Sequence, residues 1–190
     1  MRTYRPVSLN ALWFLIALNV IIFIVTLARP DAVYSLLGLS AANFLHQPWT
    51  IITNLFVHVG FWHIFGNMIS LFFLGRFLLQ LVGETRFLLV YFLGGIVGNI
   101  LFILIAPPYA IGVGASGAVF ALGGALAIMA PKVKVFIIPI PIPIPLWVAI
   151  LIFLLISFVP GIAWQAHLGG LLLGLGAGYY FRRKRTYFLR

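Results

Sequence analysis

Long apolar runs, interrupted by short polar segments, extend along almost the whole chain. A transmembrane helix needs ~20 mainly apolar residues to cross a ~30 Å hydrocarbon core. Six segments meet or approach this length, and we expect each to form a helix: residues 9–27, 62–82, 87–106, 116–130, 146–159 and 166–181. The pattern therefore predicts an all-α membrane protein, with residues 1–190 forming one six-helix domain.

Composition agrees with a lipid environment and excludes an ordinary soluble domain. Hydrophobic residues make up 64% of the chain and charged residues 7%, whereas soluble domains carry about 25% charged residues. Such a chain has too few charges to cover a water-facing surface. It also has no cysteine, which excludes disulfides, thiolate metal sites and cysteine nucleophiles.

The basic residues indicate how the helices are oriented. Twelve lysines and arginines against two acids give a net charge of +10. With both termini in the cytoplasm, only Arg29 among the basic residues falls on the outer side, in agreement with the positive-inside rule. We therefore expect a multi-pass protein of the cell (inner) membrane. This distribution explains the charge without a nucleic-acid partner, and the C-terminal basic cluster is expected to contact anionic lipid of the bilayer.

Two connections differ from ordinary loops. Residues 28–61 are rich in apolar and aromatic side chains, which favours a position in the membrane interface. Residues 138–145 alternate isoleucine with proline. Proline removes the backbone donor that a helix needs, so we expect this segment to be extended.

Three of the predicted spans carry polar side chains at their outer ends. His63 and Asn67 are four residues apart and share one face of the second span. Ser116 opens the fourth span and His167 opens the sixth. Counted from the cytoplasmic charges at about 1.5 Å per residue, these positions lie at similar depths, ~22–25 Å above the inner side. The matching depths predict one buried polar site.

This set of side chains is typical of serine hydrolases. A serine hydroxyl becomes a nucleophile when a base removes its proton, and neutral imidazole suits that role. A serine at a helix N-terminus also lies beside unpaired backbone N–H groups that can stabilise an oxyanion. The two acids, Asp31 and Glu84, fall away from Ser116 and His167 in the predicted topology. The sequence therefore predicts a dyad.

Small residues on the fourth and sixth spans predict close packing of these two helices. Gly170, Gly174 and Gly178 form a stripe that His167 continues by one turn. Such stripes let membrane helices approach backbone to backbone. Taken alone, Ser116 also fits a packing residue at this contact.

Together these elements resemble the rhomboid family of intramembrane serine proteases. The matching residues are His58, His63 and Asn67 on the second span, Gly114, Ala115, Ser116 and Gly117 at the fourth, and Ala166, His167, Gly170 and Gly174 on the sixth. The resemblance implies Ser116 as nucleophile and His167 as general base. It implies an oxyanion hole formed by His63, Asn67 and the Ser116 backbone N–H.

The same resemblance implies supporting roles for His58, Gly114, Gly117 and Phe120. Phe120 matches the aromatic position that stacks on the catalytic histidine in this family. The chain departs from the family pattern at Thr50, which follows the loop tryptophan, and around Leu79, late in the second span.

The fifth span is the shortest and is expected to be held least tightly at its outer end. It ends before Pro160 and Gly161 and is followed by Trp164. We expect substrates to enter between the second and fifth spans, at a gate restricted by Phe153 and Trp164.

The sequence thus predicts an intramembrane serine endopeptidase that cleaves membrane-anchored proteins near the outer leaflet, without a cofactor. Four histidines are present, but no H-E-x-x-H motif occurs and no carboxylate accompanies them, so no metal site is expected. Two alternatives stay open. One is a catalytically inactive rhomboid-like protein that binds membrane proteins, and the other is a transporter with polar groups at a helix terminus.

Overall fold

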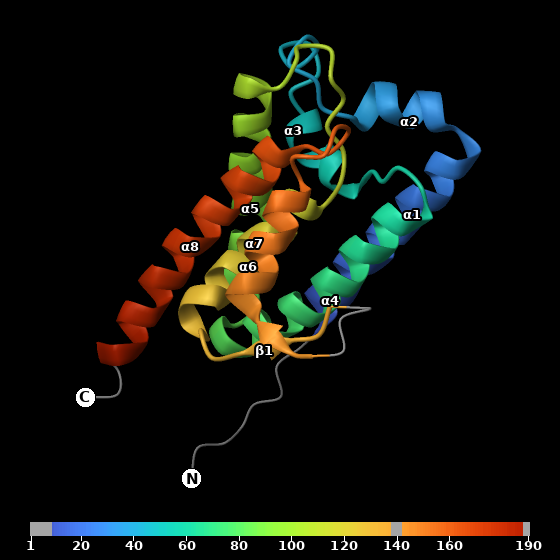
Figure 1. The fold of residues 1–190 in the computed structure, drawn as a ribbon. Coiled ribbons are helices and arrows are strands. Elements are labelled where there is room, and N and C mark those ends of the chain that lie inside the picture. The colour runs from blue at the N-terminus through green and yellow to red at the C-terminus, as the bar shows by residue number, and fades with distance from the viewer. Residues whose placement is uncertain (1–8, 138–141, 188–190) are drawn as a thin grey trace.

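The computed structural model describes residues 9–137 and 142–187. Helices dominate this part of the chain, as expected from the sequence (Figure 1). In chain order, the elements are α1 (Asn10–Ala28), α2 (Pro30–Leu37), α3 (Thr50–Thr53), the 3-10 turn η1 (Asn54–Phe56), α4 (Phe61–Val82), α5 (Glu84–Ile105), α6 (Ser116–Met129), β1 (Lys134–Val135), β2 (Ile144–Pro145), α7 (Leu146–Ile156) and α8 (Trp164–Tyr187).

Each of the six predicted spans corresponds to a helix, with small shifts at the ends. The largest difference is at α8, which continues to Tyr187; α7 stops three residues early, at Ile156, and α5 begins three residues early, at Glu84. Among the described residues, α1, α4 and α5 are long and apolar enough to cross a membrane by length and composition. The apolar helices α6 and α7 are shorter, with 14 and 11 residues. The number of spans and their orientation stay predictions.

Helix α6 lies at the centre of the bundle and packs most closely against α8. Glycine is needed at this contact, because a Cβ at Gly170, Gly174 or Gly178 would run into main-chain atoms of α6. The atoms met are the carbonyl oxygens of Gly117, Ala121 and Ala125, respectively. The predicted close packing of these two helices is therefore confirmed, and it brings the first turn of α6 beside the first turn of α8.

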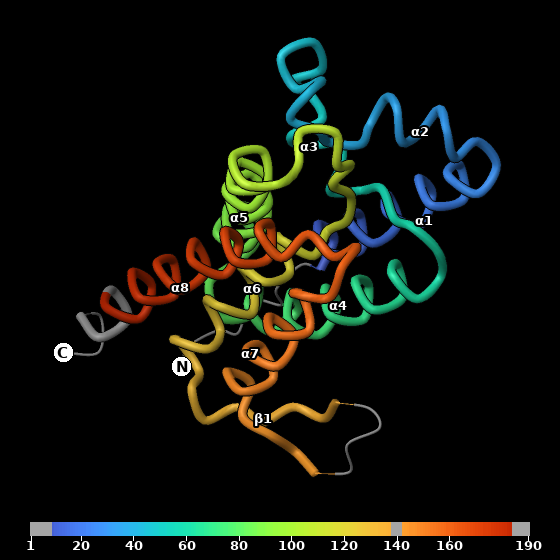
Figure 2. Tube along the Cα trace, turned by 45° about the horizontal axis from the view of Figure 1, so that its top comes forward, coloured from blue at the N-terminus to red at the C-terminus, as the bar shows by residue number. Residues whose placement is uncertain are grey.

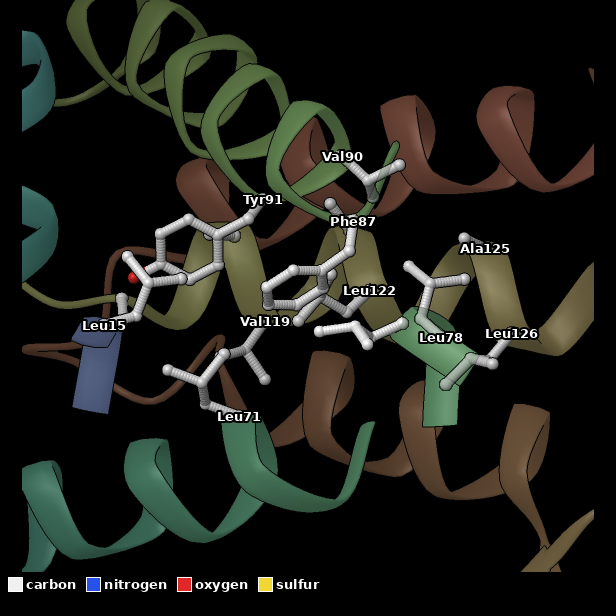
Figure 3. Packing of buried hydrophobic residues seen from close by; sticks show 14 of the residues in the cluster. Leu15, Leu71, Leu78, Phe87, Val90, Tyr91, Val119, Leu122, Ala125 and Leu126 are labelled. Carbon is white, nitrogen blue, oxygen red and sulfur yellow. The ribbon is translucent and has the colours of Figure 1, made fainter. Parts of the chain in front are cut away.

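The hydrophobic core lies where α1, α4 and α5 surround α6 (Figure 3). Leu71 and Leu78 from α4 meet Phe87 from α5 and Leu122 from α6, and all four side chains are buried. The outward faces of the helices instead expose many large apolar side chains, as expected of helices that are surrounded by lipid. The core therefore holds α6 in a fixed position.

The connection between α1 and α4 is more regular than its sequence suggests. It contains α2, α3 and η1, which lie together at one end of the bundle, opposite the small β1–β2 hairpin (Figures 1 and 2). In that hairpin Lys134 pairs with Pro145 and Val135 with Ile144. The predicted extended conformation is confirmed at Ile144–Pro145, while residues 138–141 lie outside the described part.

Candidate active site

Ser116 is the first residue of α6 and lies at the end of a tightly held loop. The N–H of Gly114 donates to the carbonyl of Asn54 at 2.9 Å, and the N–H of Ala115 donates to Nε2 of His58 at 3.4 Å. Gly114 has φ 118°, a conformation that side chains with a Cβ rarely adopt. The glycine thus lets the chain turn sharply into α6, with Ser116 at its N-terminus.

His167 reaches Ser116 from the first turn of α8. Its Nε2 lies 2.7 Å from Ser116 Oγ, a distance typical of a strong hydrogen bond. The ring of Phe120 stacks on the imidazole, with centroids 4.5 Å apart and planes at 22°. The structure therefore brings together the serine, the histidine and the aromatic residue singled out from the sequence.

His63 and Gly114 border the space beside the serine hydroxyl. A Cβ placed on Gly114 would lie 2.7 Å from His63 Nε2 and 3.7 Å from Ser116 Oγ. His63 Nδ1 accepts a hydrogen bond from the N–H of Val59 at 3.2 Å, so neutral His63 carries its own proton on Nε2. A side-chain donor therefore lies close to Ser116, where an oxyanion would need one.

Asn67 lies one turn further along α4, on the same face as His63. Its Nδ2 donates to the carbonyl of His63 at 2.8 Å. A carboxamide nitrogen carries two hydrogens, so this bond leaves the second N–H available. Asn67 is also buried.

His58 supports the loop before Ser116. It is fully buried, and its ring meets that of His63 edge to face at 4.9 Å. Burial, with a smaller contribution from the neighbouring His63, lowers the pKa of His58 from 6.5 to about 3. His58 is therefore neutral and accepts the Ala115 N–H through Nε2, a bond that would be lost on protonation.

Two hydrogen-bonded asparagines, which the sequence did not single out, also stabilise the loop before Ser116. Asn54 and Asn99 exchange two side-chain hydrogen bonds, of 3.1 and 2.7 Å. Asn54 also donates to the carbonyl of Gly112 at 3.3 Å, and Asn99 to that of Ile51 at 2.7 Å. The only sequence signal was two asparagines at or next to apolar spans, because the pairing depends on the path of the chain between them.

A second hydroxyl also contacts His167. Ser157, directly after α7, places Oγ 2.6 Å from His167 Nδ1. Sequence reasoning missed this residue, although it is the only hydroxyl-bearing side chain in the predicted fifth span. Within the described chain, the imidazole is therefore bonded to two hydroxyls rather than to a carboxylate. Asp31 lies in the first turn of α2 and Glu84 in that of α5.

The two residues predicted to form a substrate gate lie on either side of Ser157 in the chain. Phe153, on α7, has 48% of its surface exposed. Trp164 opens α8 and stacks on Phe158, with centroids 5.1 Å apart. Both belong to the segment that carries Ser157 and leads to His167.

Comparison with known proteins identifies the family to which these elements belong. Residues 45–184 match the model of the Rhomboid domain. The chain is 33% identical over 152 residues to RHOMBOID-like protein 1 of Arabidopsis thaliana, covering 80% of this chain and 39% of that protein. It is 32% identical over 147 residues to Rhomboid-like protease 3 of Toxoplasma gondii, covering 75% and 54%.

A further relative bears on activity. Over 132 residues the chain is 30% identical to Inactive RHOMBOID-like protein 8 of Arabidopsis thaliana, covering 67% of this chain and 36% of that protein. The matched part thus spans between about a third and about half of the length of these curated relatives.

Proposed function

Because the chain belongs to the rhomboid family of integral membrane proteins, we propose that it is an intramembrane serine endopeptidase with Ser116 as nucleophile and His167 as general base. The observation that carries this proposal is the 2.7 Å hydrogen bond between Ser116 Oγ and His167 Nε2 at the N-terminus of α6. A nucleophile within hydrogen-bond reach of its base is the geometry that serine catalysis requires.

The reaction follows from these two side chains. His167 Nε2 takes the hydroxyl proton while Ser116 Oγ attacks the scissile carbonyl carbon and the carbonyl π electrons move to oxygen. The imidazolium then gives its proton to the departing amine as the C–N bond breaks, which leaves an acyl-enzyme. A water molecule, deprotonated by the same histidine, hydrolyses the ester and restores Ser116.

The negative oxygen of the tetrahedral intermediate needs donors that are already in place. We assign this role to His63 Nε2, the free N–H of Asn67 and the backbone N–H of Ser116. The close approach of His63 Nε2 to Gly114, two residues before Ser116, supports this assignment. The first backbone N–H groups of α6 have no partner within the helix and add positive potential there.

The six helices α1, α4, α5, α6, α7 and α8 are proposed to span the membrane with both termini in the cytoplasm. The start of α1 and the end of α8 lie at the same end of the bundle as β1, which supports this arrangement (Figure 1). The 14 residues of α6 extend over only about 21 Å, less than a ~30 Å hydrocarbon core. This length supports a position of Ser116 below the outer membrane surface.

Substrates are proposed to be membrane-anchored proteins that enter from the lipid between α4 and α7. The cavity lined by Asn54, Asn99, Gly114, Ser116 and neighbouring residues has a volume of only about 10 Å³, too small for a peptide segment. None of its lining residues comes from α4 or α7, so substrate access between these two helices is proposed to require a movement of the bundle. The exposed apolar surface of α7, including Phe153, makes this short helix the best candidate.

The cleaved bond is proposed to lie near the outer leaflet, on the extracytoplasmic side of a cell membrane. The depth of Ser116 and the excess of basic residues at the opposite end support this side. A peptide bond within a regular helix is shielded by its own hydrogen bonds. Substrates should therefore contain helix-weakening residues near the outer end of their transmembrane segment.

The alternative is an inactive rhomboid-like protein that binds membrane proteins. The similarity to a relative named inactive favours this alternative. Against it, this chain has both the serine and the histidine, and the two side chains are hydrogen-bonded. An inactive binding protein does not require that contact.

The decisive experiment is covalent labelling with a fluorophosphonate, which reacts with activated serines. The purified protein should be labelled, whereas Ser116→Ala and His167→Ala should not be, although both variants should remain folded in detergent. Cleavage of a transmembrane reporter in liposomes should show the same dependence. Cleavage by either folded variant at the wild-type rate would refute the proposed dyad.

A further inference from the structure

The second nitrogen of His167 has a defined partner on another helix. Ser157 Oγ lies 2.6 Å from His167 Nδ1 and 2.7 Å from the carbonyl oxygen of Phe153. Ser157 is only 2% exposed, so its hydroxyl has little access to other partners. The two contacts together determine the direction of each hydrogen bond.

A serine hydroxyl has one hydrogen and two lone pairs, whereas a carbonyl oxygen can only accept. The Ser157 hydrogen therefore points to the Phe153 carbonyl, and Oγ accepts the hydrogen of His167 Nδ1. Neutral imidazole carries a single N–H. With that hydrogen on Nδ1, the lone pair lies on Nε2, the nitrogen that faces Ser116.

From this geometry we infer that Ser157 is a positioning residue, which holds His167 in the tautomer that can accept the Ser116 proton. The inference rests on the proposed function, since it assigns the base of that dyad its working form. In the opposite tautomer, Nε2 would carry the hydrogen and donate to Ser116 instead of activating it. Phe120 stacks on the face of the imidazole, and Ser157 determines which ring nitrogen of His167 carries the hydrogen.

Ser157 thereby does with a neutral hydroxyl what an aspartate does in a catalytic triad. In that arrangement a buried carboxylate orients the histidine and stabilises the imidazolium. A hydroxyl orients the ring equally well but offers a dipole instead of a full charge. Its contribution is therefore expected to be that of an ordinary neutral hydrogen bond, about tenfold in rate, far below the ~10⁴-fold effect of a triad carboxylate.

The test compares Ser157→Ala with Ser157→Thr in the full-length protein. Alanine removes the acceptor, whereas threonine retains a hydroxyl that can bond to the carbonyl four residues earlier. Thr26→Ala is the matched control, because Thr26 is a buried hydroxyl bonded to the Ile22 carbonyl at 2.8 Å with no imidazole partner shown. We expect Ser157→Ala to lower kcat and the fluorophosphonate labelling rate about tenfold, with KM unchanged. Ser157→Thr and Thr26→Ala should stay close to wild type.

Nitrogen-15 NMR of labelled histidine reads the tautomer directly, with the His167 signal assigned by its loss in His167→Ala. Wild type should show a single Nδ1–H form and Ser157→Ala a mixture. An unchanged tautomer in folded Ser157→Ala would overturn the inference, whether or not activity falls, because any loss would then be structural. If wild type is neither labelled nor active, the proposed function fails, and the NMR result alone decides the role of Ser157.

Discussion

Replacing Gly170 with alanine should separate the two proposed catalytic residues without touching either of them. Gly170 lies one turn after His167 on α8, against the carbonyl of Gly117, the residue after Ser116. A Cβ there would run into that carbonyl oxygen. Because the obstacle is main chain in the middle of a packed bundle, no side-chain rotation can relieve it, and α8 must move away from α6.

The size of this movement can be estimated from another glycine in the contact between α6 and α8. At Gly178, a Cβ would lie 2.5 Å from the carbonyl oxygen of Ala125, and ordinary contact begins at 3.4 Å. Relief there requires about 0.9 Å, and the clash at Gly170 is more severe. The Ser116–His167 hydrogen bond, at 2.7 Å, tolerates only about 0.5 Å of lengthening. Misplacement of reacting groups by about 1 Å costs ~10²-fold in rate.

The assay is the rate of fluorophosphonate labelling, measured together with thermal unfolding in detergent. Gly170→Ala should label about 100-fold more slowly. Gly176→Ala is the matched control, because it makes the same change in the same helix at an exposed position, where the added Cβ would contact no other part of the protein. It should label at the wild-type rate and gain up to ~1 kcal/mol from the better helix propensity of alanine. If folded Gly170→Ala is labelled at the wild-type rate, close packing of α6 against α8 is not what holds Ser116 and His167 together.

Three further predictions follow from the site. Asp31→Asn and Glu84→Gln should keep activity within about tenfold, since neither acid is assigned to the dyad. Asn67→Ala should instead lower kcat ~10²–10³-fold, because it removes a proposed oxyanion donor. Reporter cleavage by quantified, folded protein tests both expectations, and a ~10⁴-fold loss in an acid variant would indicate a triad. Phe153→Ala should increase cleavage of a transmembrane reporter while leaving labelling by a small fluorophosphonate unchanged, because only the large substrate needs the gate; equal reporter rates would argue against it. A substrate whose outer transmembrane segment is converted to polyleucine should resist cleavage, as judged by gel analysis in liposomes, and undiminished cleavage would exclude an unwinding step.

The helices and the α6–α8 contact could be predicted because they depend on local patterns. Apolar runs of suitable length identify the spans, and glycines at every fourth position identify a close contact. The ends of α7 and α8 were predicted less well. The Ser157 hydroxyl bonds to the Phe153 carbonyl just after α7, and the chain then turns through Gly161, with φ 91°, features that hydrophobicity does not encode.

The polar residues of the site also differ in how well they could be predicted from the sequence. Ser116 and His167 stood out because each opens an apolar span at a similar depth. Ser157 did not, since its partner comes from another helix and a lone serine is common near helix ends. The elements α2, α3 and η1 were missed because they are shorter than the window over which helical periodicity is visible.

The reciprocal bond between Asn54 and Asn99 has a consequence for how the protein assembles. Until η1 docks against α5, each of these two carboxamides lacks the partner that it has in the folded protein. Each amide is satisfied only when the outer connection and α5 come together, at the same time as Gly114 bonds to the Asn54 backbone. Insertion of α5 and completion of the loop before Ser116 are therefore coupled events. A chain with an incompletely docked outer segment would leave both amides without these partners, and the loop before Ser116 without its bond to the Asn54 carbonyl.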